Sequence, residues 1–155
     1  MSASSSPRDD LSLLSRLERL DASTVSDADK SLRVLPAAIR PVSAGSRLLG
    51  RAVTANARGD LLSVLGALRH SGPGDVLVVA AAGSQHAVAG ELFASEAARR
   101  GMAGIVIDGL CRDTATLKRM TMALAARGVA PRGQRHGHAR GQRARAARHR
   151  HGQPR

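Results

Sequence analysis

The distribution of apolar and polar positions predicts two helices near the start of the chain. Apolar residues recur at the spacing of one helix face over residues 11–20, directly after the helix-start signal Ser6-Pro7. A second, shorter helix is expected to begin at Thr24, whose hydroxyl would cap it with Asp27 three residues later. The first of these helices is amphipathic.

The next segment is expected to be extended and then to become helical. Pro36 and Pro41 restrict the backbone around them to extended or turn conformations. Residues 46–57 have the pattern of a strand, with Gly50 as a candidate bulge. Residues 60–70 return to helical spacing and are followed by Ser-Gly-Pro-Gly, a strong stop signal.

Strands and helices alternate in the next part of the chain. Residues 76–81 form a short, continuous apolar run, typical of a strand covered on both faces. We then predict a helix over residues 87–101, a buried strand over residues 103–107 and a helix over residues 113–120, with Asp113 placed to cap it. This order implies right-handed crossovers. The predicted fold class is α/β: a single domain with a mainly parallel central sheet flanked by helices.

Composition narrows the class of protein further. With 155 residues and 43% hydrophobic content, the chain is long enough for one domain but short for two. Aromatic residues make up only 1%, which argues against a base-stacking surface for single-stranded nucleic acid. The single cysteine excludes an internal disulfide, and no apolar run reaches the roughly 18 residues that span a bilayer. We therefore expect a cytoplasmic protein with no membrane segment.

The positive charge is concentrated at the C-terminal end. The net charge is +12, but residues 132–155 hold eight of the 24 Lys and Arg residues, four of the six His and no acidic residue. Because this stretch has hardly any apolar residue beyond alanine, we predict that it is disordered. The chain then divides into a domain, residues 1–131, and a basic Arg/His/Gly-rich tail, residues 132–155, that could bind nucleic acid nonspecifically.

Two predicted loops would bring an acidic residue close to an Arg-Asp pair. Residues 83–90 leave one predicted strand, and residues 108–113 leave the next. Loops at the carboxyl ends of parallel strands gather at one edge of the sheet and form a ligand crevice. Glu91, Arg112 and Asp113 are therefore expected to converge on one pocket.

These residue types suit the chemistry of a 2-oxoacid. The peptide N–H groups of Glu91, Leu92 and Phe93 would lie at a helix N-terminus, which favours an anion such as a carboxylate. Arg112 offers a planar fork for a carboxylate or a keto oxygen, and Asp113 is a hard oxygen ligand for Mg²⁺ or Mn²⁺. Metal and arginine together can stabilise the negative charge of an enolate, and Glu91 can orient or deprotonate a water.

Five blocks of the sequence resemble a known family. TVSDA (24–28), GRAVTA (50–55), PGDVLVV (73–79), GEL (90–92) and GIVIDGLCRD (104–113) are similar to the 4-hydroxy-4-methyl-2-oxoglutarate aldolase family, whose relatives include the regulator of ribonuclease E activity A (RraA). The family's aldolases carry an acidic residue, twenty further residues and then Arg-Asp. This chain has that spacing, with Glu in a place often held by Asp.

The resemblance implies a metal-dependent class II pyruvate aldolase with an RraA-like swivelling α/β/α fold. Such enzymes cleave 4-hydroxy-2-oxoacids and often decarboxylate oxaloacetate. By position, Asp113 would hold Mg²⁺ or Mn²⁺, Arg112 would bind the keto acid and stabilise the pyruvate enolate, and Glu91 would manage the catalytic water. The implied catalytic set is Glu91, Arg112 and Asp113, and the implied substrate-binding set is Gly90, Glu91, Leu92, Phe93 and Arg112. The family also suggests a homotrimer or hexamer.

The resemblance ends after residues 126–132, where members of the family continue with further strands. We interpret the tail as the product of divergence, truncation or a frameshift, because Arg, Ala, Gly, His, Pro and Gln are what GC-rich DNA tends to encode in a shifted frame. Missing strands would expose sheet edges and apolar surface, so we expect poor stability or aggregation.

Simpler roles remain open for each of these residues. Arg112 and Asp113 can be a loop arginine and a helix cap, and the helix dipole alone favours Glu91 in a first turn. His86 is expected to face solvent, and Cys111, which has no placed base, to be a buried, inert thiol.

Asp108 is expected to make a turn with Gly109, with a supporting role in the site as the alternative. Two other functions also stay open: a non-catalytic regulator of an RNA-degrading enzyme, and a polycationic tail that binds RNA or DNA.

Overall fold

The computed structural model describes residues 7–45, 47–57 and 60–133. Helix α1 (Pro7–Leu17) lies where the sequence predicts it, although its expected cap, Ser6, is outside the described residues. Helix α2 (Ala22–Ala28) begins two residues earlier than predicted, so Thr24 lies inside it. Asp21 occupies the N-cap position instead, without a side-chain cap hydrogen bond.

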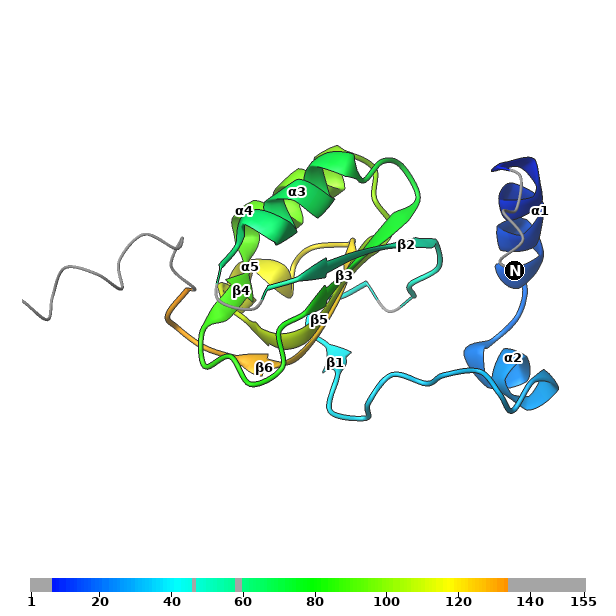
Figure 1. Ribbon diagram of the computed structural model, residues 1–155, viewed down its shortest axis with the longest axis horizontal. Helices are drawn as coiled ribbons and strands as arrows, with labels where there is room; N and C mark the ends of the chain where they lie inside the picture. Colours follow the sequence, from blue (N-terminus) through cyan, green and yellow to red (C-terminus); the bar gives the residue numbers. More distant parts are fainter. Residues whose placement is uncertain (1–6, 46, 58–59, 134–155) are drawn as a thin grey trace, which may run out of the picture.

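Helices α1 and α2 form an arm at the side of the sheet (Figure 1). Helix α2 buries none of its residues. The arm is held to the following segment by Arg47, whose Nη2 donates hydrogen bonds to the carbonyl oxygens of Leu17, Glu18 and Leu20 at 3.1, 2.7 and 2.9 Å. These carbonyls lie at or just after the end of α1, where helix carbonyl groups lack partners and favour a cation. Polar contacts therefore anchor the arm.

Six strands of the described chain form one sheet. They are β1 (Arg40–Pro41), β2 (Arg51–Asn56), β3 (Asp75–Ala80), β4 (Ala87–Ala89), β5 (Gly104–Cys111) and β6 (Ala123–Val129). The main path of the sheet is β1-β6-β5-β3-β2, and β4 pairs with β5. All pairs are parallel except β1 with β6. This sheet confirms the predicted α/β class.

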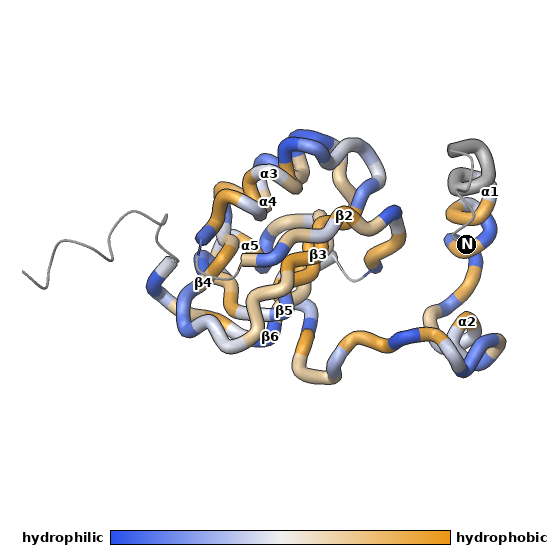
Figure 2. The backbone as a smooth tube through the Cα atoms, viewed as in Figure 1, coloured by the Kyte–Doolittle hydropathy of each residue, from blue (hydrophilic) through white to orange (hydrophobic). Residues whose placement is uncertain are grey.

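Three helices supply the crossovers and cover the sheet. Helix α3 (Leu62–His70) follows β2, α4 (Glu91–Arg99) follows β4, and the single turn α5 (Thr114–Leu117) follows β5. The core lies between these helices and the strands, where Leu77, Ile105 and Ile107 have no exposed surface. Burying each such side chain contributes about 1.5–3 kcal/mol. Figure 2 shows the central strands and the β4 end of the α3–α4 pair in hydrophobic colours.

The structure corrects three of the predicted elements. The predicted helix over residues 87–101 begins with strand β4, and α4 starts only at Glu91. Strand β5 runs to Cys111, so most of the predicted loop 108–113 is strand, and strand β6 was not predicted. Both missed strands are rich in alanine, which has little strand preference. They form because β5 offers pairing partners that are distant in the sequence.

Gly50 lies just before β2 and is not in a bulge. A Cβ atom at this position would collide with the carbonyl oxygen of Gly74, so glycine allows two backbone segments to approach closely. Among the described residues, no helix is long and apolar enough to cross a bilayer. The predicted disorder of the tail lies outside the described residues, except for Arg132 and Gly133.

Candidate functional site

Strand β4 brings the start of α4 beside the end of β5. The first part of β5 pairs with β3, and its last residues pair with β4, with Ala89 opposite Cys111. The Arg112 N–H donates a hydrogen bond to the Ala89 carbonyl oxygen at 3.1 Å. At the start of β4, the Ala87 N–H donates a hydrogen bond to the Arg132 carbonyl oxygen at 2.9 Å. The first residues assigned to the tail therefore pair with the domain.

Gly90 allows these two segments to touch. It is the N-cap residue of α4 and is buried. A Cβ atom here would lie 2.8 Å from Arg112 Cγ and closer still to Asp113 Oδ2, where no real Cβ atom fits. Any larger residue would therefore displace the Arg112-Asp113 pair.

Asp113 places its carboxylate at the N-terminus of α4. Its Oδ2 accepts a hydrogen bond from the Glu91 N–H at 3.1 Å and lies 3.4 Å from Arg112 Nε. Asp113 is the N-cap residue of α5, but its side chain makes no cap hydrogen bond there. The prediction that Asp113 caps α5 is wrong. Its backbone is left-handed (φ 59°, ψ 36°), and its side chain caps α4 instead. An aspartate tolerates this conformation better than most residues.

The amides of the first turn of α4 are available to an anion. The Ala94 N–H bonds to the Gly90 carbonyl, and the Glu91 N–H is taken by Asp113. Within the described residues, the N–H groups of Leu92 and Phe93 have no hydrogen-bond acceptor. Both residues line the cavity described below.

A cavity of about 380 Å³ opens at this junction, between α3 and α4. This volume is within the usual range of small-molecule sites, about 300–1,000 Å³. Gly90, Arg112 and Asp113 form its polar end, together with Gly133. Leucines of α3 and its N-cap, residues of β4 and the first turns of α4 form the rest. These are Leu61, Leu65, Leu68, Ala87, Val88, Ala89, Leu92, Phe93 and Glu96.

The structure separates Glu91 from the other predicted site residues. Its backbone N–H contacts Asp113, but its side chain is exposed and does not line the cavity. Arg112, by contrast, keeps 43% of its side chain exposed and lies along the cavity wall. A Cβ atom at Gly133 would lie 2.7 Å from Arg112 Nη1, so this glycine also leaves space for the guanidinium.

The residues present fit a divalent cation at Asp113. Both described side-chain contacts of Asp113 use Oδ2, and within the described residues Oδ1 has no hydrogen-bond or ion-pair partner. A single carboxylate is enough for Mg²⁺, which usually keeps several waters and binds through one or two carboxylates. No group of three or more His, Cys, Asp or Glu side chains that could hold a metal occurs in the described chain. Asp113 therefore suits a water-rich metal site that substrate oxygens would complete.

The other polar candidates lie outside the cavity. Asp108 is within β5 and pairs with Arg127, so the predicted turn with Gly109 is wrong. His86 is partly buried in the loop before β4, where its N–H donates to Ser84 Oγ at 3.2 Å. Cys111 is fully buried, and burial raises the pKa of its thiol, so it is a poor nucleophile.

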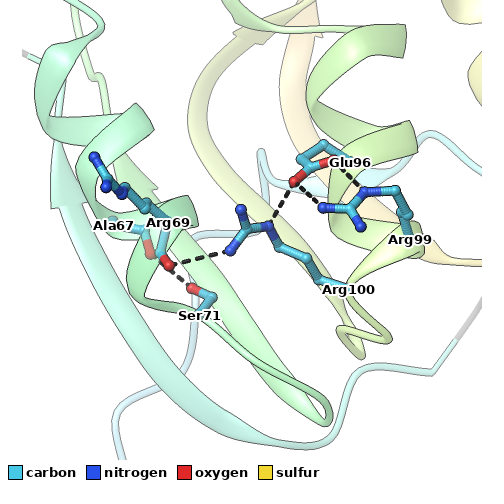
Figure 3. A network of polar contacts seen from close by, with 6 residues as sticks. All are labelled: Ala67, Arg69, Ser71, Glu96, Arg99 and Arg100. Atoms are coloured by element: carbon cyan, nitrogen blue, oxygen red, sulfur yellow. Dashed lines mark hydrogen bonds and ion pairs between the residues drawn. The ribbon is translucent and has the colours of Figure 1, made fainter.

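Glu96 is a cavity residue that the sequence analysis missed. Its carboxylate accepts hydrogen bonds from Arg99 Nε and Nη2 at 2.7 and 2.9 Å and from Arg100 Nε at 2.7 Å (Figure 3). Arg99, and then Arg100, lower the pKa of Glu96 from its ordinary 4.5 to about 2. Arg100 also donates to the Arg69 carbonyl oxygen at the end of α3. The i,i+3 and i,i+4 spacing of a Glu and two Arg residues on one helix is the sequence signal for this network.

Comparison with known proteins settles the family. The family described as "RraA-like: Aldolase/RraA" matches residues 22–147. The chain belongs to this family. A protein of Halalkalibacterium halodurans named "Putative 4-hydroxy-4-methyl-2-oxoglutarate aldolase" is 32% identical over 122 residues, which are 77% of this chain and 58% of that protein. A Burkholderia multivorans protein of the same name is 37% identical over 103 residues, or 66% of this chain and 63% of that protein.

The RraA-like fold is shared with solved structures. The RNA-processing inhibitor RraA from Thermus thermophilis superposes with a TM-score of 0.71 at 28% identity, covering 77% of this chain and 73% of that one. The chain spans about three fifths of the length of the curated relatives that it matches. The family match reaches 16 residues past the predicted domain end at residue 131, a boundary that stays a prediction.

Proposed function

We propose that this protein is a divalent-metal-dependent pyruvate aldolase that cleaves 4-hydroxy-2-oxoacids such as 4-hydroxy-4-methyl-2-oxoglutarate. The observation that carries the proposal is the meeting of Arg112 and Asp113 with the N-terminus of α4 at one end of a cavity. The names of the curated relatives support the same reaction class.

The chain's own groups account for binding of the oxoacid. The substrate carboxylate would accept hydrogen bonds from the N–H groups of Leu92 and Phe93, which lack other acceptors among the described residues. Arg112 would donate to the C2 keto oxygen from the cavity wall. Gly90 contributes because it has no Cβ atom and so leaves room for the side chains of Arg112 and Asp113.

The cleavage itself needs a base and a stabilised oxyanion. Loss of the proton from the C4 hydroxyl lets the C3–C4 bond break, and its electron pair passes to the C2 oxygen as an enolate. Arg112 would stabilise the charge on that oxygen, and return of a proton to C3 completes pyruvate. Glu91, whose side chain is exposed and does not line the cavity, would act through a water rather than on the substrate directly.

A bound Mg²⁺ or Mn²⁺ would supply a Lewis acid for the keto acid oxygens, and Asp113 would hold it through Oδ1. The same arrangement would support decarboxylation of oxaloacetate, since that reaction also leaves a pyruvate enolate. A homotrimer or hexamer working in the cytoplasm, with nonspecific nucleic-acid binding by the basic tail, belongs to the same proposal.

The test is pyruvate release with Mg²⁺ or Mn²⁺ and with chelator, for the unaltered chain, Asp113→Asn and Asp108→Asn. Asn can keep the backbone conformation and the hydrogen bond to Glu91, but it lacks the charge that binds the metal. We expect a loss on the order of 100-fold or more in Asp113→Asn. Asp108→Asn is the matched control, because Asp108 pairs with Arg127 outside the cavity. Chelator-insensitive turnover, or equal loss in both variants, would contradict the proposal.

A second candidate is a non-catalytic regulator of an RNA-degrading enzyme. The observation that favours it is the similarity to the RNA-processing inhibitor from Thermus thermophilis over 77% of this chain. A regulator would bind and inhibit a ribonuclease E-type enzyme equally well before and after Asp113→Asn. An RNA-cleavage assay with both forms therefore separates the two functions.

A further inference from the structure

The charges of the cavity are divided unevenly between its two ends. Among the described lining residues Arg112 is the only cation, and it lies at the end to which the proposed function assigns the oxoacid head. At the other end the only charged lining residue is Glu96, whose carboxylate is already paired with Arg99 and Arg100.

The space between these charges is apolar. Leu61 and Leu68 are 7% and 5% exposed, and they line the cavity from the α3 side. Leu65 of α3, which is 41% exposed, and Phe93 of α4 are also part of this lining. A ligand group extending from the polar end would therefore contact mainly leucine and phenylalanine side chains.

We infer that the cavity selects 4-hydroxy-2-oxoacids whose C4 carries an alkyl chain, in preference to those with a second carboxylate. This inference rests on the proposed function and specifies its substrate class. An alkyl chain between α3 and α4 gains hydrophobic stabilisation. A distal carboxylate there would lose water among apolar side chains and meet no lining cation to compensate it.

The reaction balances without any further reactant. A substrate R–CHOH–CH₂–CO–COO⁻ loses its C4 hydroxyl proton, the C3–C4 bond breaks, and the C4 fragment leaves as the aldehyde R–CHO. The electron pair of the broken bond passes through the enolate to a new C3–H bond, which gives pyruvate. R is the alkyl chain that the leucines would contact.

The test compares 4-hydroxy-2-oxoheptanoate with 4-hydroxy-4-methyl-2-oxoglutarate in kcat/KM for pyruvate release, with Mg²⁺ present. We expect the alkyl substrate to be preferred at least about tenfold. Leu65→Arg places a cation at the apolar end and should reverse the preference. Leu62→Arg is the matched control: Leu62 lies on the same helix, is 63% exposed and is not among the lining residues. It should leave the ratio unchanged.

A binding measurement provides a readout that does not depend on turnover. Calorimetric titration with 2-oxohexanoate and 2-oxoglutarate, neither of which can be cleaved, should show tighter binding of the alkyl acid. Leu65→Arg should reverse this order, and Leu62→Arg should preserve it.

The possible results are distinct. If pyruvate is released but the dicarboxylate is preferred or equal, the inference is overturned and the proposed function stands. If no substrate yields pyruvate, the proposed function fails, and the titration decides whether the cavity still prefers alkyl oxoacids. Equal binding of both acids, or the same effect in both arginine variants, overturns the inference in either case.

Discussion

Helix α4 has a carboxylate at each end, and the two differ in how fully they are bonded. Glu96, toward its C-terminus, accepts three hydrogen bonds of 2.7–2.9 Å from two arginines. Asp113, at its N-terminus, accepts one from a backbone N–H at 3.1 Å and lies 3.4 Å from Arg112 Nε. Both of these contacts use the same oxygen, Oδ2.

The difference separates a structural carboxylate from one that can take a ligand. Both carboxylate oxygens of Glu96 accept hydrogen bonds from arginines, so the group is held as an anion. These bonds join Glu96 to Arg99, the last residue of α4, and to Arg100, its C-cap. Asp113 lines the cavity, and its Oδ1 has no partner within the described residues, which is what a metal or a substrate group requires. The carboxylate with more arginine hydrogen bonds is therefore the less available of the two to a ligand.

The largest expected effect comes from Gly90→Ala. The added methyl group would displace Asp113 Oδ2 and Arg112 Cγ, and a shift of about 1 Å at a reacting centre can cost on the order of 100-fold in rate. We expect that loss in pyruvate release, with little change at the Glu96 end. The measurement is kcat/KM beside the unfolding midpoint.

Gly66→Ala is the matched control for this change. Gly66 lies within α3, and a Cβ atom there would have no neighbour within 4 Å. It should keep full activity and stabilise the helix by up to about 1 kcal/mol. Full activity in Gly90→Ala would show that the contact between Gly90 and Asp113 is unimportant.

The next effect is on stability, at Asp113. Asp113→Ala removes the acceptor for the Glu91 N–H and places an alanine in a left-handed backbone conformation. We therefore expect it to lower the free energy of unfolding by about 1–3 kcal/mol. Asn tolerates this conformation and can still accept the hydrogen bond. Urea unfolding should therefore rank Asp113→Asn close to the unaltered chain and Asp113→Ala well below it. Equal midpoints for the two variants would contradict the capping role.

A pH-dependent effect is expected at the other end of α4. Because the pKa of Glu96 is lowered from 4.5 to about 2 in the folded state, its ionised form stabilises the fold above pH 4.5. This contribution is lost as the pH falls through about 2. The Tm difference between the unaltered chain and Glu96→Gln should be constant near neutrality and shrink between these two pH values. A difference that stays the same down to pH 2 would argue against the arginine contacts.

The smallest effect should separate the two arginines. Arg100 is 27% exposed and also bonds to the Arg69 carbonyl of α3, whereas Arg99 is 70% exposed and contacts only Glu96 among its described hydrogen bonds. Exposed ion pairs contribute little. Arg100→Ala should therefore lower Tm more than Arg99→Ala, and the reverse order would show that α3 gains nothing from Arg100.

The apolar runs of the sequence predicted the elements whose signals are local. Strands β3 and β5 and helix α3 lie within a few residues of their predicted positions, because continuous apolar runs and helical spacing are local signals. Strands β4 and β6 were missed, since three to seven alanine-rich residues become strands only beside β5. The domain boundary and the roles of the site residues stay predictions.

By itself, the sequence determined the α/β class, the concentration of basic residues at the C-terminal end, and the spacing between an acidic helix start and an Arg-Asp pair. Only the tertiary structure decided that Asp113 caps α4, that the Glu91 side chain stays outside the cavity and that Glu96 lines it. The first set depends on residue types and spacing along the chain. The second depends on which oxygen meets which N–H across a strand pairing, and such contacts between distant segments exist only once the sheet has formed.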